Sequence, residues 1–466
     1  MKEFSSIDTV IIVSMIIAYI LFTSWLTVRL RSKNTEQFMV ASRAMPAIVV
    51  GVLLMSEFIG AKSTVGTAES AFKYGIAAAW SVLGASIGYF LYGLFMVKRL
   101  YGSGEYTISG AIAHKYGNST KYAVSIIMIY ALLLVNVGNY ISGAAALATV
   151  LKVHLPTAMC IIAVVSTFYY VFGGLKGVAY VTVLHSAIKY IGVAIILVVA
   201  LSMTGGISPM AAKLPDYYFT WDGKIGASTI LAWVIGTAGA IFSTQFVVQA
   251  ISSSKSSEDA KKSTMYAALF CFPLGFALAI IGVAARYLFP QMKALYALPI
   301  FMEGMNPYLA GVVATSLVAS VFVSVSTVAL AIASLAVKDF YVPFYKPSEE
   351  KEFKMTRIIS IIIGFLPLIF VFFAPEILKL SFFTRAIRLS ISVVAMIGFY
   401  LPFFNSSRGA NIGLLGAAVA TSVWYMLGDP YGINNMYIAL LSPIIIIAVE
   451  KLFCKKDIKP EAASKN

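Results

Sequence analysis

Long stretches of apolar residues, separated by short polar segments, run through the whole chain. Most are about 20 residues long, the length that an α-helix needs to cross the hydrocarbon core of a bilayer. They lack the alternation of apolar and polar positions that is typical of barrel strands. The pattern predicts an all-α membrane protein with 13 transmembrane helices, at 7–28, 46–71, 76–98, 121–150, 156–174, 178–204, 226–250, 263–287, 308–337, 355–374, 378–404, 409–428 and 434–453.

Composition supports this class, because 60% of the residues are hydrophobic and only 12% are charged. A soluble chain of this length would expose large apolar patches to water, whereas a bilayer removes that cost. The formal net charge of +15 does not indicate a nucleic-acid partner, because Lys and Arg gather in alternate loops, as in Arg29 to Lys33 and Lys346 to Lys354. This bias predicts a multi-pass protein of the plasma (inner) membrane, with its N-terminus outside and its C-terminus in the cytoplasm.

The second helix, 46–71, has Ser56, Glu57, Gly60, Lys62 and Ser63 in its middle. Ionisable groups and irregular backbone are tolerated at this depth only where they face protein or a water-filled cavity. Freed carbonyls at a break can bind a cation, and the following helix start favours an anion. The sequence therefore predicts a broken helix with a functional site. The alternative is a structural Glu57–Lys62 pair, which also requires a break, because residues five apart do not face each other on a regular helix.

A second interruption is expected in helix 226–250, where Gly236 and Gly239 lie mid-helix and Gln245 and Gln249 follow. Five helices separate the two interrupted segments, counted from one start to the other. Two broken helices in matching positions indicate an inverted-repeat transporter with a site near the middle of the membrane.

Polar side chains in two other helices are candidates for the same site. Arg385 and Arg388 lie near the start of helix 378–404 and suit carboxylate or phosphate recognition, unless they extend to the outer headgroups. Asn139 interrupts helix 121–150 and could line a cavity or bond to a neighbouring helix.

Four motifs, in this order, resemble those of the sodium:solute symporter family. They are GTAESAFKYG at 66–75, GGLKGVAYVTVLHSAIKYIG at 173–192, QAISSSKSSEDAKKS at 249–263 and KDFYVPF at 338–344. The resemblance covers nearly the whole chain. It implies a LeuT-like core of two inverted five-helix repeats, 46–204 and 226–404, after an N-terminal helix and loop (1–45). Two C-terminal helices (405–453) and a disordered cytoplasmic tail (454–466) would follow.

The resemblance also implies a sodium site between the first broken helix and the eighth core helix. Its candidate ligands are the carbonyls of Ser56 and Ile59 with Ser320 and Ser324. The chain departs from the family pattern at Val323, where a hydroxyl is usual, and at Thr182, where the family has Asp. At most one sodium site is therefore expected.

The expected function is secondary active transport, with Na⁺-coupled symport of a small polar solute, an anion among the candidates. The candidate substrate contacts are Glu57, Lys62, Ser63, Asn139, Gln245 and Arg385. The sequence has neither a P-loop nor a His/Cys/Asp cluster that would indicate an enzyme, so none is expected. Sodium is the expected coupling ion, and no organic cofactor, nucleic acid or obligate protein partner is expected.

Two alternatives stay open. One is a Na⁺-independent or proton-coupled carrier on the same fold, in which Lys62 replaces the ion; this residue could otherwise bind a carboxylate of the substrate or pair with Glu57. The other is a membrane sensor that binds the solute without transporting it.

Overall fold

The computed structural model describes residues 5–151, 153–303, 305–370 and 377–453, without the side chains of residues 61, 62, 145, 146, 149, 150 and 377–379. Nearly all of this part of the chain is helical, and it forms no strand. By length and composition, nine of its helices can cross a membrane, or eleven if each of two bent helix pairs counts as one crossing. The all-α membrane class is confirmed.

The helices follow the predicted segments closely. The long ones are α1 (Ser6–Arg29), α5 (Trp80–Phe95), α8 (Asn118–Leu151), α9 (Leu155–Thr204), α13 (Ser257–Leu288), α14 (Pro307–Leu335), α16 (Glu349–Phe365), α18 (Ile377–Tyr400), α19 (Ser407–Met426) and α20 (Asn435–Phe453). The two bent pairs are α3 (Ala47–Phe58) with α4 (Ala61–Tyr74), and α11 (Ala227–Ser243) with α12 (Gln245–Ser252). The shorter helices are α2 (Thr35–Val40), α6 (Val97–Gly102), α7 (Ile108–Tyr116), α10 (Ile207–Lys213), α15 (Val342–Tyr345) and α17 (Pro367–Phe370).

Two predicted helices, 156–174 and 178–204, are the halves of α9. This helix has 50 residues and bends at Gly174, whose φ of 55° lies in the left-handed region that favours glycine. At 1.5 Å per residue, α9 is too long for a single crossing. α19 has a spanning length but is not among the helices apolar enough to count. Thirteen crossings therefore stays a prediction.

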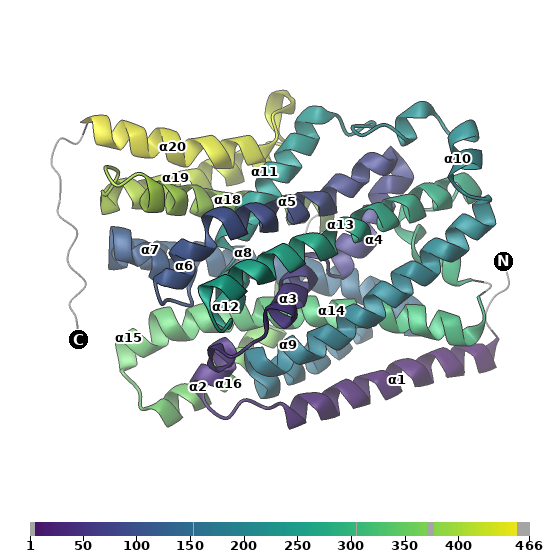
Figure 1. Cartoon of the computed structure of the whole chain (residues 1–466), viewed down its shortest axis with the longest axis horizontal. Helices are drawn as coiled ribbons and strands as arrows, with labels where there is room; N and C mark the ends of the chain where they lie inside the picture. Colours follow the sequence, from purple (N-terminus) through teal and green to yellow (C-terminus); the bar gives the residue numbers. More distant parts are fainter. Residues whose placement is uncertain (1–4, 152, 304, 371–376, 454–466) are drawn as a thin grey trace.

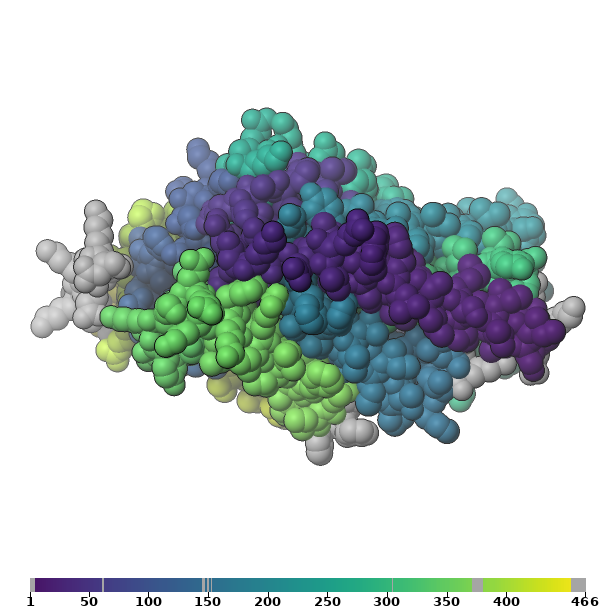
Figure 2. Space-filling view, turned by 90° about the horizontal axis from the view of Figure 1, so that it is seen from below, coloured from purple at the N-terminus to yellow at the C-terminus, as the bar shows by residue number. Residues whose placement is uncertain are grey.

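α14 is the centre of the molecule. It is buried on every side, as expected for a helix that is apolar all round. It packs against α9, α8, α1, α16 and α3 (Figure 1). By contrast, α1 is largely exposed and lies along the outer surface beside α9 (Figure 2). The interior thus surrounds α14, and the α3–α4 bend lies against it.

The two ends of the bundle differ in the short helices that they carry. α1 begins at one end and α20 finishes at the other (Figure 1). The short helices α6, α7 and α15 lie toward the end where α20 finishes, whereas α10 lies at the opposite end. The arrangement agrees with an odd number of crossings. The predicted repeats 46–204 and 226–404 stay a prediction, although each begins with a pair bent by 51°. The predicted tail 454–466 lies outside the described residues.

A buried carboxylate just after the C-terminal end of α14 binds the neighbouring helices. Asp339 lies in a turn of π-helix (Ala336–Tyr341) and is fully buried. Its side chain accepts hydrogen bonds from the hydroxyls of Ser109 on α7 and Ser125 on α8. The Lys121 amino group lies 3.2 Å from it. One carboxylate therefore joins three helices.

Replacing Lys121 by Ala is expected to destabilise the protein by about 3 kcal/mol, because the Asp339 carboxylate would stay buried without its countercharge. The measurement is the midpoint of thermal unfolding of the purified protein in detergent. Lys98→Ala, at an exposed lysine, is the matched control and should leave the midpoint unchanged. Equal midpoints for both variants would show that the pair does not stabilise the fold.

Candidate functional site

The break that the sequence predicts in helix 46–71 lies at Ile59 and Gly60. α3 ends at Phe58, Ile59 leaves the helical region with φ −100° and ψ 64°, and Gly60 is extended with ψ −171°. The two arms are bent by 51°. The bend interrupts the regular pattern of backbone hydrogen bonds in the middle of a spanning segment, so each freed carbonyl needs another donor.

Gly60 allows the bend to touch the central helix. A Cβ atom at this position would lie 1.7 Å from Oγ of Ser324 on α14, which no side chain could tolerate. The structure therefore brings together the two elements that the family resemblance assigns to the sodium site.

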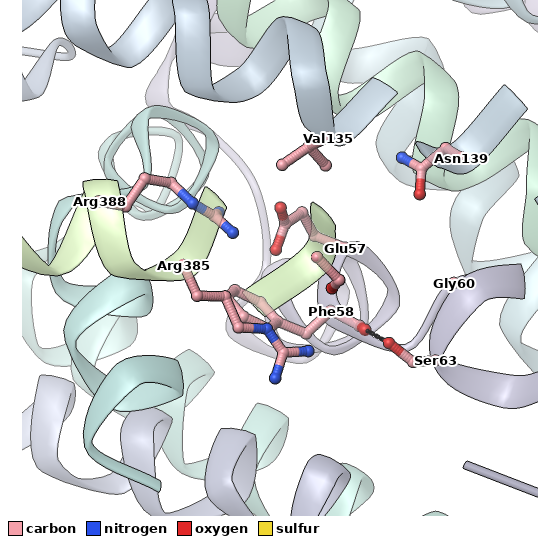
Figure 3. A pocket seen from close by; sticks show the side chains of 9 residues that line it. Glu57, Phe58, Gly60, Ser63, Val135, Asn139, Arg385 and Arg388 are labelled. Atoms are coloured by element: carbon pink, nitrogen blue, oxygen red, sulfur yellow. Dashed lines mark hydrogen bonds between the residues drawn. The ribbon is translucent and has the colours of Figure 1, made fainter. Parts of the chain in front are cut away.

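Three consecutive carbonyls at the bend accept hydrogen bonds from side chains. The Ser63 hydroxyl donates to the Phe58 carbonyl at 2.5 Å, as Figure 3 shows. The Gly60 carbonyl accepts from both the backbone N–H and the hydroxyl of Thr64, at 3.0 and 2.9 Å. Between them, the Ile59 carbonyl accepts from Nζ of Lys189 on α9 at 2.5 Å.

A cavity of about 30 Å³ lies beside this bend (Figure 3). A water molecule occupies about 10–15 Å³ on this measure, so the cavity has room for about two. Its lining comes from α3, α4, α8 and α18, and consists of Glu57, Phe58, Gly60, Ser63, Val135, Asn139, Ser381, Arg385 and Arg388. Four of the six predicted substrate contacts, Glu57, Ser63, Asn139 and Arg385, therefore meet at one place.

Two arginines of α18 supply the positive charge of this cavity. Both are buried, so the alternative in which they extend to the outer headgroups is wrong. Arg385 donates to the Thr237 hydroxyl at 2.9 Å, and Arg388 to the Thr244 hydroxyl at 2.7 Å. In Figure 3 the Arg388 guanidinium points toward the Glu57 carboxylate.

A second cavity, of about 20 Å³, lies next to the first. The two share Ser63, Ser381 and Arg385. The second is otherwise lined by Gly66, Thr67, Ser70, Ser81, Trp233 and Phe382. The residues from α4 in it lie three or four apart, so one helix face forms this wall. The space beside the bend therefore continues along α4.

The second predicted interruption is real, but it lies further along the chain than the glycines indicated. α11 continues through Gly236 and Gly239 and ends at Ser243, and Thr244 is the bend residue, with ψ 121°. The two glycines permit close packing instead: a Cβ atom at Gly236 would lie 2.2 Å from Met436, and one at Gly239 would lie 2.1 Å from Leu389.

Gln245 does not line the cavity. Its side-chain oxygen accepts from the backbone N–H of Ile108 at 3.0 Å, and its side-chain nitrogen donates to the Tyr106 carbonyl at 2.9 Å. Both partners lie where the chain enters α7. The amide thus binds the loop before α7, and a substrate contact at Gln245 stays a prediction.

Two of the predicted cation ligands, Ser320 and Ser324, lie beside Gly60 at the bend, but the predicted serine side chains bond within the protein. The hydroxyls of Ser320 and Ser324 each donate to the carbonyl four residues earlier, at 2.9 Å. Ser56 hydrogen-bonds through its hydroxyl to Ser186 of α9. Val323 is buried and adds no hydroxyl. The Lys62 side chain lies outside the described residues, so its three proposed roles stay open.

Lys189 is the residue at the bend that sequence reasoning missed. It was one of the few basic residues inside a predicted helix, and that position was the available signal. Arg388 was recognised as an anion-binding candidate but was not included in the predicted substrate set; the structure gives it the same cavity as Arg385.

Comparisons with known proteins identify the family to which the chain belongs. The model of the sodium:solute symporter family matches residues 38–416. The chain is 22% identical to a sodium/glucose cotransporter of Vibrio parahaemolyticus, over 90% of this chain and 85% of that protein. It is also 22% identical to a sodium/pantothenate symporter of Escherichia coli, over 78% of this chain and 80% of the relative.

A solved structure of a substrate-bound, outward-open Na⁺-coupled sialic acid symporter has a similar fold. The TM-score is 0.80 at 18% identity, and the match covers 97% of this chain and 99% of the other. This likeness confirms the LeuT-like fold. The relatives are transporters rather than enzymes, and their family supports sodium as a coupling ion. The chain is a multi-pass membrane transporter that belongs to the sodium:solute symporter family.

Proposed function

We propose that this transporter carries a small organic anion, bound through a carboxylate by Arg385 and Arg388. The observation that carries this proposal is the pair of guanidiniums buried at one cavity beside the α3–α4 bend. Among the described lining side chains there are two cations and one carboxylate, Glu57. These described side chains carry a net charge of +1, which a monoanionic solute would balance.

The chemistry of the two arginines fits a carboxylate. A guanidinium has five N–H groups in a planar fork that matches the two oxygens of a carboxylate. The threonine contacts, at Thr237 and Thr244, hold the side chains in place and leave further N–H groups on each. Asn139 and Ser63 add neutral polar groups at the same cavity. Pantothenate and sialic acid, named as the solutes of two relatives, are both carboxylic acids.

The two bent helix pairs suit transport by alternating access. A cavity with room for about two water molecules is too small for an organic solute, so binding requires the surrounding helices to separate. The second cavity along α4 is a route by which the solute could reach the arginines from one side. Rocking of the bent pairs against the rest of the bundle would then open the site to each side in turn.

Two modes of coupling are candidates. Family membership favours sodium-coupled symport, with sodium as a second cargo. The hydrogen bond from Lys189 to the Ile59 carbonyl favours the other mode, sodium-independent carriage, because that carbonyl is one of the oxygens assigned to the ion. For orientation we propose that the N-terminus is outside, because the Lys- and Arg-rich loops then face the cytoplasm.

In proteoliposomes, the protein is expected to take up radiolabelled small monocarboxylates, and not their uncharged amides, because only the acids balance the arginines. Counterflow after preloading with the unlabelled acid measures transport directly. Uptake of the amides at the same rate would contradict the anion proposal. Binding of an acid without counterflow would instead indicate a sensor.

Arg388→Gln is expected to raise the carboxylate concentration for half-maximal uptake by about 10-fold to 100-fold, the usual worth of a lost charge-assisted hydrogen bond. Arg408→Gln, at an exposed arginine outside both cavities, is the matched control and should behave as the wild type. An equal loss of transport in the two variants, or no change in Arg388→Gln, would remove Arg388 from the site.

A further inference from the structure

The amino group of Lys189 binds one of the oxygens that the family resemblance assigns to sodium, the Ile59 carbonyl. Lys189 is 1% exposed and donates to the Ile59 carbonyl at 2.5 Å. Ile59 directly follows the last residue of α3, so its carbonyl is one that the bend frees from helical bonding. A lysine of a separate helix therefore satisfies this oxygen.

The packing of α9 holds Lys189 in this place. Three residues before it, Ser186 hydrogen-bonds to Ser56 of α3. Three residues after it, Gly192 lies so close to α14 that a Cβ atom would be 2.1 Å from the Ser316 hydroxyl. With α9 fixed to both α3 and α14, the lysine side chain extends from a set position toward the bend.

The neighbouring carbonyls are also supplied with donors by the chain. The Phe58 carbonyl accepts from Ser63, and the Gly60 carbonyl accepts from Thr64. On α14, Val323 offers no oxygen from its side chain at the position where a hydroxyl would be expected. The hydroxyl of Ser324 is the remaining side-chain ligand of the predicted set close to the bend.

One face of α9 is more positively charged than the family pattern. Thr182 takes the place of the family's acidic residue, and Lys189 lies two turns further along the same face of α9. A sodium ion sharing the Ile59 carbonyl with an ammonium group would be roughly 4 Å from it. At an effective dielectric constant of about 20, repulsion at that distance weakens ion binding by roughly a thousandfold.

We propose that the Lys189 amino group replaces sodium at this site and holds the α3–α4 bend in the way that an ion would. Transport by this chain then needs no sodium bound between α3 and α14. The inference extends the proposed anion transport by deciding its ion requirement, and it rests on the contact with Ile59 rather than on the identity of the solute.

The test measures thermal unfolding of the purified full-length protein in detergent, in sodium chloride and in N-methylglucamine chloride of equal ionic strength. Wild type is expected to unfold at the same temperature in both salts. Lys189→Met is expected to unfold at a lower temperature without sodium and to be stabilised by sodium. This gain should disappear in the double variant Lys189→Met/Ser324→Ala.

Lys176→Met, at an exposed lysine of the same helix, is the matched control and should respond to neither salt. Sodium stabilisation of the wild type that is lost in Ser324→Ala would overturn the proposal, even if Lys189→Met did not fold. Because the test contains no solute, its outcome is independent of the carboxylate uptake experiment. Failure of that experiment would overturn the anion proposal alone.

Discussion

A helix that breaks inside a membrane leaves carbonyl oxygens without partners where water cannot supply them, and this constraint governs the site. In this chain the Phe58 carbonyl accepts a hydrogen bond from the Ser63 hydroxyl, the Ile59 carbonyl from the Lys189 amino group, and the Gly60 carbonyl from Thr64. Two of the donors come from the helix that follows the break, but the third comes from α9. The bend is therefore stable only in a folded bundle that places Lys189 beside it.

The bundle achieves this placement through small residues around α14. Gly60 and Gly192 each lie too close to serines of this helix for any side chain to fit. Such close approach lets the broken helix and α9 contact the same central helix, since packing and hydrogen bonds, rather than the hydrophobic effect, drive association between helices in lipid. Beyond the end of α14, the buried Asp339 carboxylate joins α7 and α8 by accepting hydrogen bonds from a serine of each helix.

Charge is distributed unevenly between the two sides of the bend. Arg385 and Arg388 face the cavity, where Glu57 balances one of them, whereas Lys189 faces the backbone from α9. An anionic solute and a built-in cation are consistent with each other, because the protein would supply at the bend the positive charge that relatives take from solution. Arg385 and Arg388 would then bind the solute, and Lys189 would hold the shape of the bend.

The amino-acid sequence by itself determined the membrane class, the positions of the helices and the location of the first break. These features depend on runs of apolar residues and on local breakers such as Gly60, and both can be read along the chain. It also pointed to Glu57, Ser63, Asn139 and Arg385, which line one cavity, because polar groups in apolar helices are costly and thus conspicuous.

Only the tertiary structure decided which of these polar groups meet. Gln245 resembles a cavity residue in the sequence, but it binds the backbone before α7. The second break lies at Thr244, because Gly236 and Gly239 serve helix packing instead. Lys189 reaches Ile59 across 130 residues of chain. Such contacts depend on how helices distant in sequence pack against α14, and periodicity along one helix carries no information about its partner.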